Sequence, residues 1–150
     1  MAPRTQRIPP SRKDALKSMA ILIDADILIR AERGDFDLEA WLRSRGDEEF
    51  RLAAITMAEL WHGVERATGA HRIRRQRFLE RIFALFEPVG YTAMTAFQHA
   101  RLWAELEASG RMIGAHDLIL AAIAMERGDS VATFNIRHFK SVKGLKVISP

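Results

Sequence analysis

Residues 20–23 form a continuous apolar run that ends directly at an acidic residue, Asp24. A strand with one face in solvent alternates apolar and polar residues, whereas a strand without this alternation is buried on both faces. Strands of the second kind belong mainly to parallel sheets that helices cover on both sides. The run therefore predicts a central strand of a helix-covered sheet, with Asp24 at its carboxyl end.

Short apolar runs alternate with longer helical patterns along the rest of the chain. Further strands are expected at residues 52–55, 88–91, 130–133 and 146–148. Helices are expected at residues 27–34, 36–46, 56–67, 71–86 and 116–127, and over a segment that Thr95 and Gln98 cap and that ends at Ser109. Strands separated by helices predict the α/β class, here a three-layer α/β/α domain with a mainly parallel central sheet.

The chain of 150 residues has no internal repeat and no linker after residue 18, so one domain is expected over residues 19–150. No apolar run reaches the roughly 20 residues that span a bilayer, and no membrane segment is expected. Cysteine is absent, which excludes disulfides, thiolate metal sites and a catalytic thiol. This absence fits a cytoplasmic location.

The first 18 residues differ from the rest in charge and composition. They hold five basic side chains against one acidic one, so that the net charge of +4 of the whole chain resides there, and they hold three of the five prolines. They show neither a regular period nor the 7–15 apolar residues of a secretory signal. We interpret residues 1–18 as a flexible basic leader, or as a product of a start codon placed before Met19. The net charge is therefore weak evidence for nucleic-acid binding by the domain.

Acidic and polar residues follow the predicted strands or open the predicted helices. They are Asp24, Asp26, Glu59, Asp117, Thr133 and Asn135. Sites of open α/β sheets form beyond the carboxyl ends of the strands, so these side chains are expected at one rim. Carboxylates gathered there repel one another unless a cation lies between them, and hard oxygen ligands select Mg²⁺ or Mn²⁺. Such a metal can activate water and stabilise a phosphoryl transition state.

Three of these acids also have structural interpretations. Glu59 lies three residues after Thr56 and completes a capping box at a helix start. Asp117 fits as an ordinary acid in the first turn of a helix. A structural role is hardest to find for Asp24, because a carboxylate that ends a buried strand needs polar partners.

Asp26 is interpreted first as the N-cap of a helix beginning at Ile27, and second as a metal ligand. His116 adjoins an acid, but no second histidine stands at metal-binding spacing from it. A lone histidine is more often a hydrogen-bonded or exposed side chain than a ligand. None of the five histidines is therefore assigned a catalytic role.

Four segments resemble a known family. They are residues 21–29 (ILIDADILI), 55–67 (ITMAELWHGVERA), 113–122 (IGAHDLILAA) and 131–139 (VATFNIRHF), the last followed by Gly144-Leu145. In this order and at this spacing they resemble the PIN domain, and they are most similar to the VapC-type toxins of bacterial toxin–antitoxin pairs. The resemblance covers nearly all of residues 19–150. It implies a PIN-like fold and leaves residues 1–18 without a role.

The resemblance also implies an activity, that of a Mg²⁺-dependent endoribonuclease that cuts RNA with metal-activated water. Asp24 and Asp117 would be direct metal ligands, while Glu59 would help to bind the metal or orient the attacking water. Many PIN domains have a fourth acid in the final loop, where this chain has Asn135 and His138. The set is thus expected to hold one metal well and a second poorly, which leaves a two-metal mechanism in doubt.

Positive charge near the acidic rim is needed if RNA is to approach it. Residues 71–81 contain five arginines and one glutamate. A helix there would turn Ile73, Phe78, Leu79, Ile82 and Leu85 to the core and leave Arg74, Arg75 and Arg81 largely exposed. The sequence leaves open whether this face binds phosphates or is simply solvated.

The family further implies a protein partner, a cognate antitoxin. It also implies an assembly, either a homodimer or a toxin–antitoxin hetero-oligomer. Apolar residues such as Phe36, Leu38, Trp41 and Trp61 could line a groove for the antitoxin. Ordinary core packing is nevertheless the favoured role for each of them.

Two other functions are weighed against the nuclease. Asp24 and Asp26 also resemble the Asp-x-Asp motif of haloacid-dehalogenase-type phosphatases, in which they would act as nucleophile and general acid. That chemistry needs a later lysine and an acid pair, for which Gly128-Asp129 is a poor substitute. The other alternative is a catalytically degenerate PIN module that binds RNA or a protein without cutting, and the missing fourth carboxylate supports it.

Overall fold

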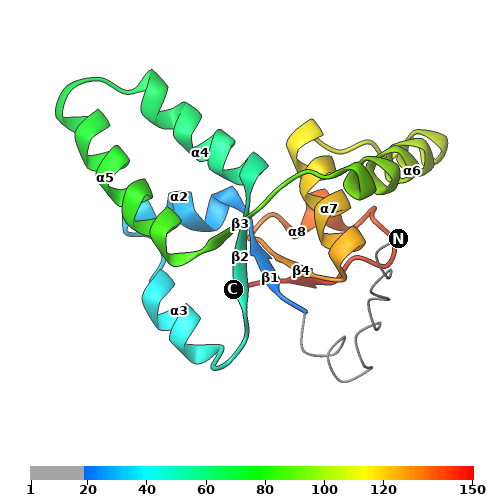
Figure 1. Ribbon diagram of the computed structural model, residues 1–150, viewed down its shortest axis with the longest axis horizontal. Helices are drawn as coiled ribbons and strands as arrows, with labels where there is room; N and C mark the ends of the chain where they lie inside the picture. The colour runs from blue at the N-terminus through cyan, green and yellow to red at the C-terminus, as the bar shows by residue number, and fades with distance from the viewer. Residues whose placement is uncertain (1–18) are drawn as a thin grey trace, which may run out of the picture.

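The computed structural model describes residues 19–150, so the leader expected at residues 1–18 lies outside the described residues. Its centre is a five-stranded sheet with the strand order β3-β2-β1-β4-β5, in which every neighbouring pair is parallel (Figure 1). The strands are β1 (Ile21–Ile23), β2 (Phe50–Ala53), β3 (Glu87–Val89), β4 (Ser130–Ala132) and β5 (Val147–Ile148). The predicted parallel sheet is confirmed.

Seven helices in residues 19–150 complete the fold. They are α2 (Ala25–Arg33), α3 (Leu38–Ser44), α4 (Ala54–Arg66), α5 (Gly69–Leu85), α6 (Ala93–Ser109), α7 (Ala115–Arg127) and α8 (Ile136–Phe139). Helices α2 to α5 lie on one side of the sheet and α6 to α8 on the other, which confirms the three-layer α/β/α architecture (Figure 1). None of these helices is both long and apolar enough to cross a membrane.

The apolar run that opens the domain is buried on both faces of the sheet. Ile21 and Ile23 pack in one core cluster with residues of α2 to α5. Leu22, between them, packs in the other cluster with residues of α6, α7 and α8. Burial of side chains on both faces is the reason why the run lacks polar residues.

The four apolar residues considered for a groove mainly join the core, as the sequence favoured. Leu38 is buried, while Phe36, Trp41 and Trp61 are partly buried and pack against the same cluster. Phe36 and Trp41 are also in tilted ring contact, with 5.9 Å between their centroids.

Two predicted helix starts near the sheet rim are wrong, because both helices begin two residues earlier than expected. Helix α2 begins at Ala25, and its N-cap is Asp24 rather than Asp26. Helix α4 begins at Ala54, so Thr56 lies inside the helix, 2% exposed, and forms no capping box with Glu59. The apolar run at 52–55 contains the end of β2 and the first turn of α4. The sequence pattern alone does not show where the strand ends and the helix begins.

The cap of α6 is also shifted. Its N-cap is Thr92, whose side chain accepts a hydrogen bond from the backbone N–H of Thr95 at 3.3 Å. The Thr95 hydroxyl accepts in return from the Thr92 N–H at 3.1 Å. Because threonine takes the place of the usual glutamate or glutamine in this capping box, the sequence pattern placed the cap at Thr95 instead.

Helix α5 buries less apolar surface than its sequence predicts. Leu79 and Ile82 are buried, but Ile73 is 53% exposed and Leu85 is 67% exposed, so the predicted inward orientation of these two is wrong. The helix forms an antiparallel hairpin with α4 at the side of the domain (Figure 1). Only a narrow stripe of α5 therefore reaches the core.

Asp129 anchors the start of β1 at the end of the sheet opposite Asp24. It is 4% exposed, and its Oδ1 accepts a hydrogen bond from the Ala20 N–H at 2.9 Å. Its Oδ2 accepts from Arg127 Nε at 2.9 Å. This carboxylate has a structural role, and it is not the second acid that a phosphatase would place beside Asp24.

Candidate active site

The site lies where the strand order reverses, at the carboxyl ends of β1 and β4. The chain proceeds from β1 to β2 and β3 on one side, whereas β4 and β5 lie on the other. The register pairs Ile23 with Ala132, so the residues that follow them, Asp24 and Thr133, are neighbours. Crevices at such switch points are where open α/β sheets bind ligands.

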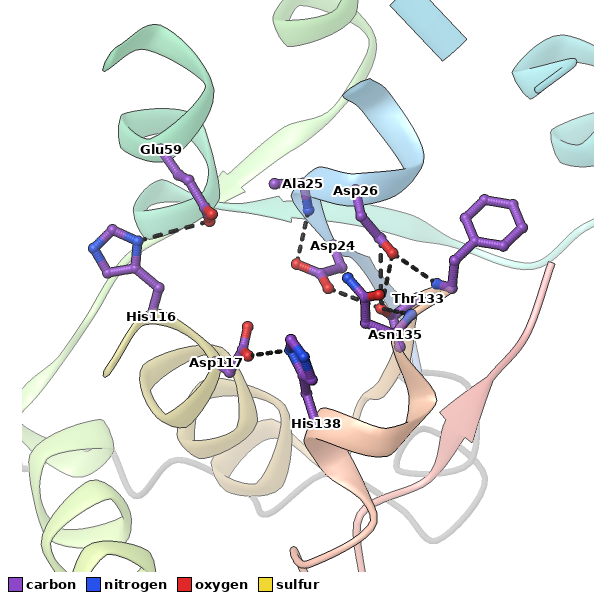
Figure 2. Close-up of polar contacts among 10 residues, drawn as sticks. Asp24, Ala25, Asp26, Glu59, His116, Asp117, Thr133, Asn135 and His138 are labelled. Carbon is purple, nitrogen blue, oxygen red and sulfur yellow. Dashed lines mark hydrogen bonds and ion pairs between the residues drawn. The ribbon is translucent and has the colours of Figure 1, made fainter. Parts of the chain in front are cut away.

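Thr133 connects the two strands through its hydroxyl group. The group donates to Asp24 Oδ2 at 2.8 Å and accepts from the Asn135 N–H at 3.0 Å (Figure 2). Both carboxylate oxygens of Asp26 lie 3.4 Å from the same hydroxyl. Because Thr133 is fully buried, these contacts hold the two acids in place without competition from water.

We expect Thr133→Val to lower the free energy of unfolding by about 1–3 kcal/mol, since it leaves buried polar groups without a partner. Valine has nearly the same shape as threonine, so the loss reports on the hydroxyl. Denaturant titration measures it, and Thr133→Ser, which keeps the hydroxyl, is the matched control. Equal stability of Thr133→Val and the wild type would show that the hydroxyl does not organise the acids.

Asp26 is held by backbone groups that follow β4. Its Oδ2 accepts a hydrogen bond from the Phe134 N–H at 3.0 Å. The Phe134 ring is fixed in turn by Phe36, in an edge contact of 5.2 Å, and by the guanidinium of Arg30, 4.3 Å from the ring centroid. Asp26 is thus a member of the acid cluster, and its predicted role as an N-cap is wrong.

Burial and charge repulsion determine the protonation of the two neighbouring acids. Asp24 is 7% exposed, and burial, followed by repulsion from Asp26, raises its pKa to about 7. Repulsion from Asp117 makes a smaller contribution to the same rise, whereas hydrogen bonds from Thr133 and the Ala25 N–H oppose it. Burial also raises the pKa of Asp26, against hydrogen bonds from the backbone of Phe134, Ile27 and Asn135. The protein therefore holds Asp24 and Asp26 at a site where a cation would favour their ionised forms.

Glu59 and Asp117 face the same region from α4 and α7 (Figure 2). The Glu59 side chain is 43% exposed and lies 3.7 Å from His116 Nδ1, too far for a hydrogen bond. Asp117 is more enclosed, with 22% of its side chain exposed, and its Oδ2 lies 2.8 Å from His138 Nδ1. Asp117 is thus oriented by a partner, while Glu59 is free to turn.

The structure brings together the predicted Asp24, Asp117 and Asn135 at one rim, with Glu59 at its edge (Figure 2). The Asn135 side chain is exposed, and its backbone rather than its side chain bonds to Thr133. His116 and His138 were not predicted as site residues, although each contacts an acid. Their pairing depends on the relative positions of α4, α7 and α8, which no spacing in the sequence reveals.

The donor set fits a hard divalent cation in its chemistry. In residues 19–150, however, no three carboxylate or imidazole groups approach closely enough to hold one metal ion. Glu59 and Asp117 are turned towards the imidazoles of His116 and His138 (Figure 2). Carboxylate oxygens are nonetheless the ligands that Mg²⁺ prefers, and a cation would relieve the repulsion that raises the pKa of Asp24.

Comparison with known proteins assigns the family. The sequence model of the PIN domain family matches residues 21–145 of this chain. The chain belongs to the PIN domain family. It is 31% identical to ribonuclease VapC1 of Rickettsia felis over 132 residues, covering 87% of this chain and 96% of that protein. It is 28% identical to the tRNA(fMet)-specific endonuclease VapC of Salmonella typhimurium over 96 residues, covering 64% of this chain and 71% of that protein.

Solved structures agree with this assignment of the PIN domain. The VapBC2 complex of Rickettsia felis, bound to a DNA fragment from its promoter, contains a chain that superposes with a TM-score of 0.80 at 24% identity. The match covers 88% of this chain and 99% of that one. The predicted recognition as a VapC-type PIN domain is confirmed, and so is the PIN-like fold. The names of the relatives support the predicted enzyme class, an endoribonuclease.

Proposed function

We propose that this PIN domain is the ribonuclease toxin of a toxin–antitoxin pair and hydrolyses RNA phosphodiester bonds in a Mg²⁺-dependent reaction. The observation that carries the proposal is the buried pair Asp24 and Asp26, with Asp117 near enough to raise the pKa of Asp24. Such a pair is costly to keep without a cation, and strongly perturbed acids in a cleft mark functional sites. The VapC ribonucleases that resemble this chain along most of their length support the same function.

Asp24, Asp117 and Glu59 would hold the metal once Asp117 and Glu59 turn from His138 and His116 towards Asp24, with Mn²⁺ as a possible substitute for Mg²⁺. When bound, the ion would lower the pKa of a water molecule and offset negative charge on the phosphate in the transition state. Asp24 is held in position for this role by Thr133 and by the Ala25 N–H at 2.8 Å. The exposed Glu59 is able to turn towards the metal or orient the attacking water.

The composition of the rim favours one metal ion over two. Asn135 and His138 stand where many PIN domains have a further acid, and neither supplies a carboxylate. His138 contacts Asp117 instead, at 2.8 Å, and positions that acid. A depression lined by Asp117 and His138 is lined also by Arg111 and Arg137, which offer positive charge to a phosphate group.

A cognate antitoxin is the proposed protein partner. Among the structures that resemble this chain are VapBC and FitAB complexes, several of them bound to DNA. We propose that the chain forms a homodimer or a comparable toxin–antitoxin hetero-oligomer. The cytoplasmic location expected from the sequence stays a prediction.

The test of the proposed function is incubation of the purified full chain, freed of any partner, with total RNA in Mg²⁺ or in EDTA. We expect discrete cleavage in Mg²⁺ only, and mapping of the cut ends then identifies the target and sequence. No cleavage by folded, metal-loaded protein would contradict the proposal and favour the degenerate PIN module. Cleavage that persists in EDTA would contradict the metal dependence.

A further inference from the structure

Two grooves on the α4–α5 hairpin join the acidic rim to the middle of α5. The first is lined by Glu59, His62, Arg66, His71 and Arg75. The second, between α2 and α5, is lined by Arg33, His71, Arg74, Arg75, Arg77 and Arg81. Because His71 and Arg75 line both grooves, the two form one path that begins beside Glu59, and we call it the basic path.

The positive charge of the basic path has almost no acidic counterpart. Among the described residues, none of its other arginines forms an ion pair; these are Arg33, Arg66, Arg74, Arg77 and Arg81. Glu32 also lines the second groove, but it is already paired with Arg75. Guanidinium groups gathered along one groove repel one another unless anions lie between them.

Arg75 is fixed at the junction of the two grooves. Its Nε donates to Glu32 Oε1 at 2.8 Å, its Nη1 donates to the Gly63 carbonyl at 3.4 Å, and 21% of its side chain is exposed. A Cβ atom at position 63 would lie 2.8 Å from Nη1, so the missing side chain of Gly63 leaves the space that this guanidinium occupies against α4. The prediction that Arg75 is largely exposed is wrong, because the side chain is held as part of the groove.

We propose that the basic path binds the backbone phosphates of the RNA substrate and leads the strand past Arg75 to Glu59 and the acidic rim. This inference rests on the proposed ribonuclease function for the identity of the anion. In this proposal α5 contributes to RNA affinity rather than to the cleavage reaction, since none of its arginines contacts Asp24. Phosphate contacts of this kind position a nucleic acid without reading its sequence.

The apolar content of the grooves favours RNA over an acidic protein segment. The α2–α5 groove offers Phe78 as its one large apolar side chain in the described residues. The neighbouring groove between α3 and α5 is instead lined by Phe36, Leu38, Leu42, Ile82 and Leu85. Protein interfaces usually have an apolar core, so a protein partner fits that neighbouring groove better than the basic path.

The test compares two triple variants that remove the same charge. Arg74→Gln, Arg77→Gln and Arg81→Gln change exposed arginines of the basic path, whereas Arg43→Gln, Arg101→Gln and Lys143→Gln change exposed cations elsewhere. Binding of a fluorescent single-stranded RNA is measured by anisotropy in EDTA, at several salt concentrations. We expect the path variant to raise Kd at least about tenfold and to reduce the salt slope by about 2, since each single-strand phosphate contact contributes roughly 0.7. The control variant should keep both values close to those of the wild type.

Equal affinities of the two triple variants would overturn the proposal, and so would an unchanged salt slope in the path variant, because general charge would then explain the binding. If the path variant binds an acidic polypeptide more weakly than the wild type does but binds RNA equally well, the basic path would belong to a protein partner instead. Melting temperatures of both variants check that each is folded. Because binding in EDTA needs no cleavage, a protein that binds RNA through the path but never cuts it would contradict the proposed function and leave this inference standing.

Discussion

Asp24→Asn is expected to lower the rate of RNA cleavage at least about a hundredfold, which corresponds to about 2.7 kcal/mol of lost transition-state stabilisation. The substitution keeps the shape of the side chain and an oxygen that accepts from the Ala25 N–H, but it removes the negative charge proposed to bind the metal. Cleavage of a defined RNA under single-turnover conditions in Mg²⁺ measures the loss. Asp117→Asn should produce a loss of similar size.

Asp129→Asn is the matched control for this prediction. It makes the same chemical change at another buried carboxylate, one that bonds to Ala20 and Arg127 rather than to the site. Its cleavage rate per folded molecule should stay within about threefold of the wild type, because it makes no contact with the acidic rim. Full activity in Asp24→Asn, or an equal loss in Asp129→Asn, would show that Asp24 is not the group on which the reaction depends.

The same Asp24→Asn change should make the metal-free protein more stable, by about 2–4 kcal/mol at pH 8. The pKa of Asp24 is about 7 in the folded protein and near 4 in the unfolded chain, so the folded state retains a proton that the unfolded state loses. Wild-type stability therefore falls as the pH rises from about 4 to about 7 and stays low above it. Asparagine does not ionise, so the gain should vanish below about pH 4 and be complete above pH 7.

Denaturant titration of the wild type and Asp24→Asn in EDTA, at pH 4, 6 and 8, measures this difference. Mg²⁺ should narrow it at pH 8, because binding to the folded wild type stabilises that protein alone. A variant less stable than the wild type at pH 8 in EDTA would mean that the ionised carboxylate stabilises the metal-free fold. We expect instead that the variant is more stable, which would mean that Asp24 is retained for function at a cost in stability.

The central strand and its acid were predictable because burial on both faces imposes a local pattern. Residues 20–23 contain no polar side chain, and the structure covers both faces of β1 with helices. The rule that sites form at the carboxyl ends of parallel strands then placed Asp24, Asp117 and Asn135 at one rim. The family resemblance added roles to these residues, and the strand order explains why they meet.

Other parts of the site depend on contacts that no local pattern encodes. Asp26 was assigned to a cap because short polar residues before apolar runs usually have that role, yet the backbone after β4 binds it. His138 reaches Asp117 across 21 residues of sequence, through the packing of α8 on α7. Likewise, the position of Arg75 depends on the missing side chain of Gly63 in the facing helix, which is visible only once the two helices are paired.

Because β1 pairs with β4, the acidic rim assembles only late in the synthesis of the chain. Asp24 is among the first residues of the domain to be synthesised, whereas its hydroxyl partner Thr133 lies 109 positions later, in a strand that pairs directly with β1. A nascent chain still lacking β4 has no neighbour on that side of β1 and no donor for Asp24. Translation that stops before Thr133 thus yields fragments without an assembled acidic rim, so the proposed activity requires that β4 has been made.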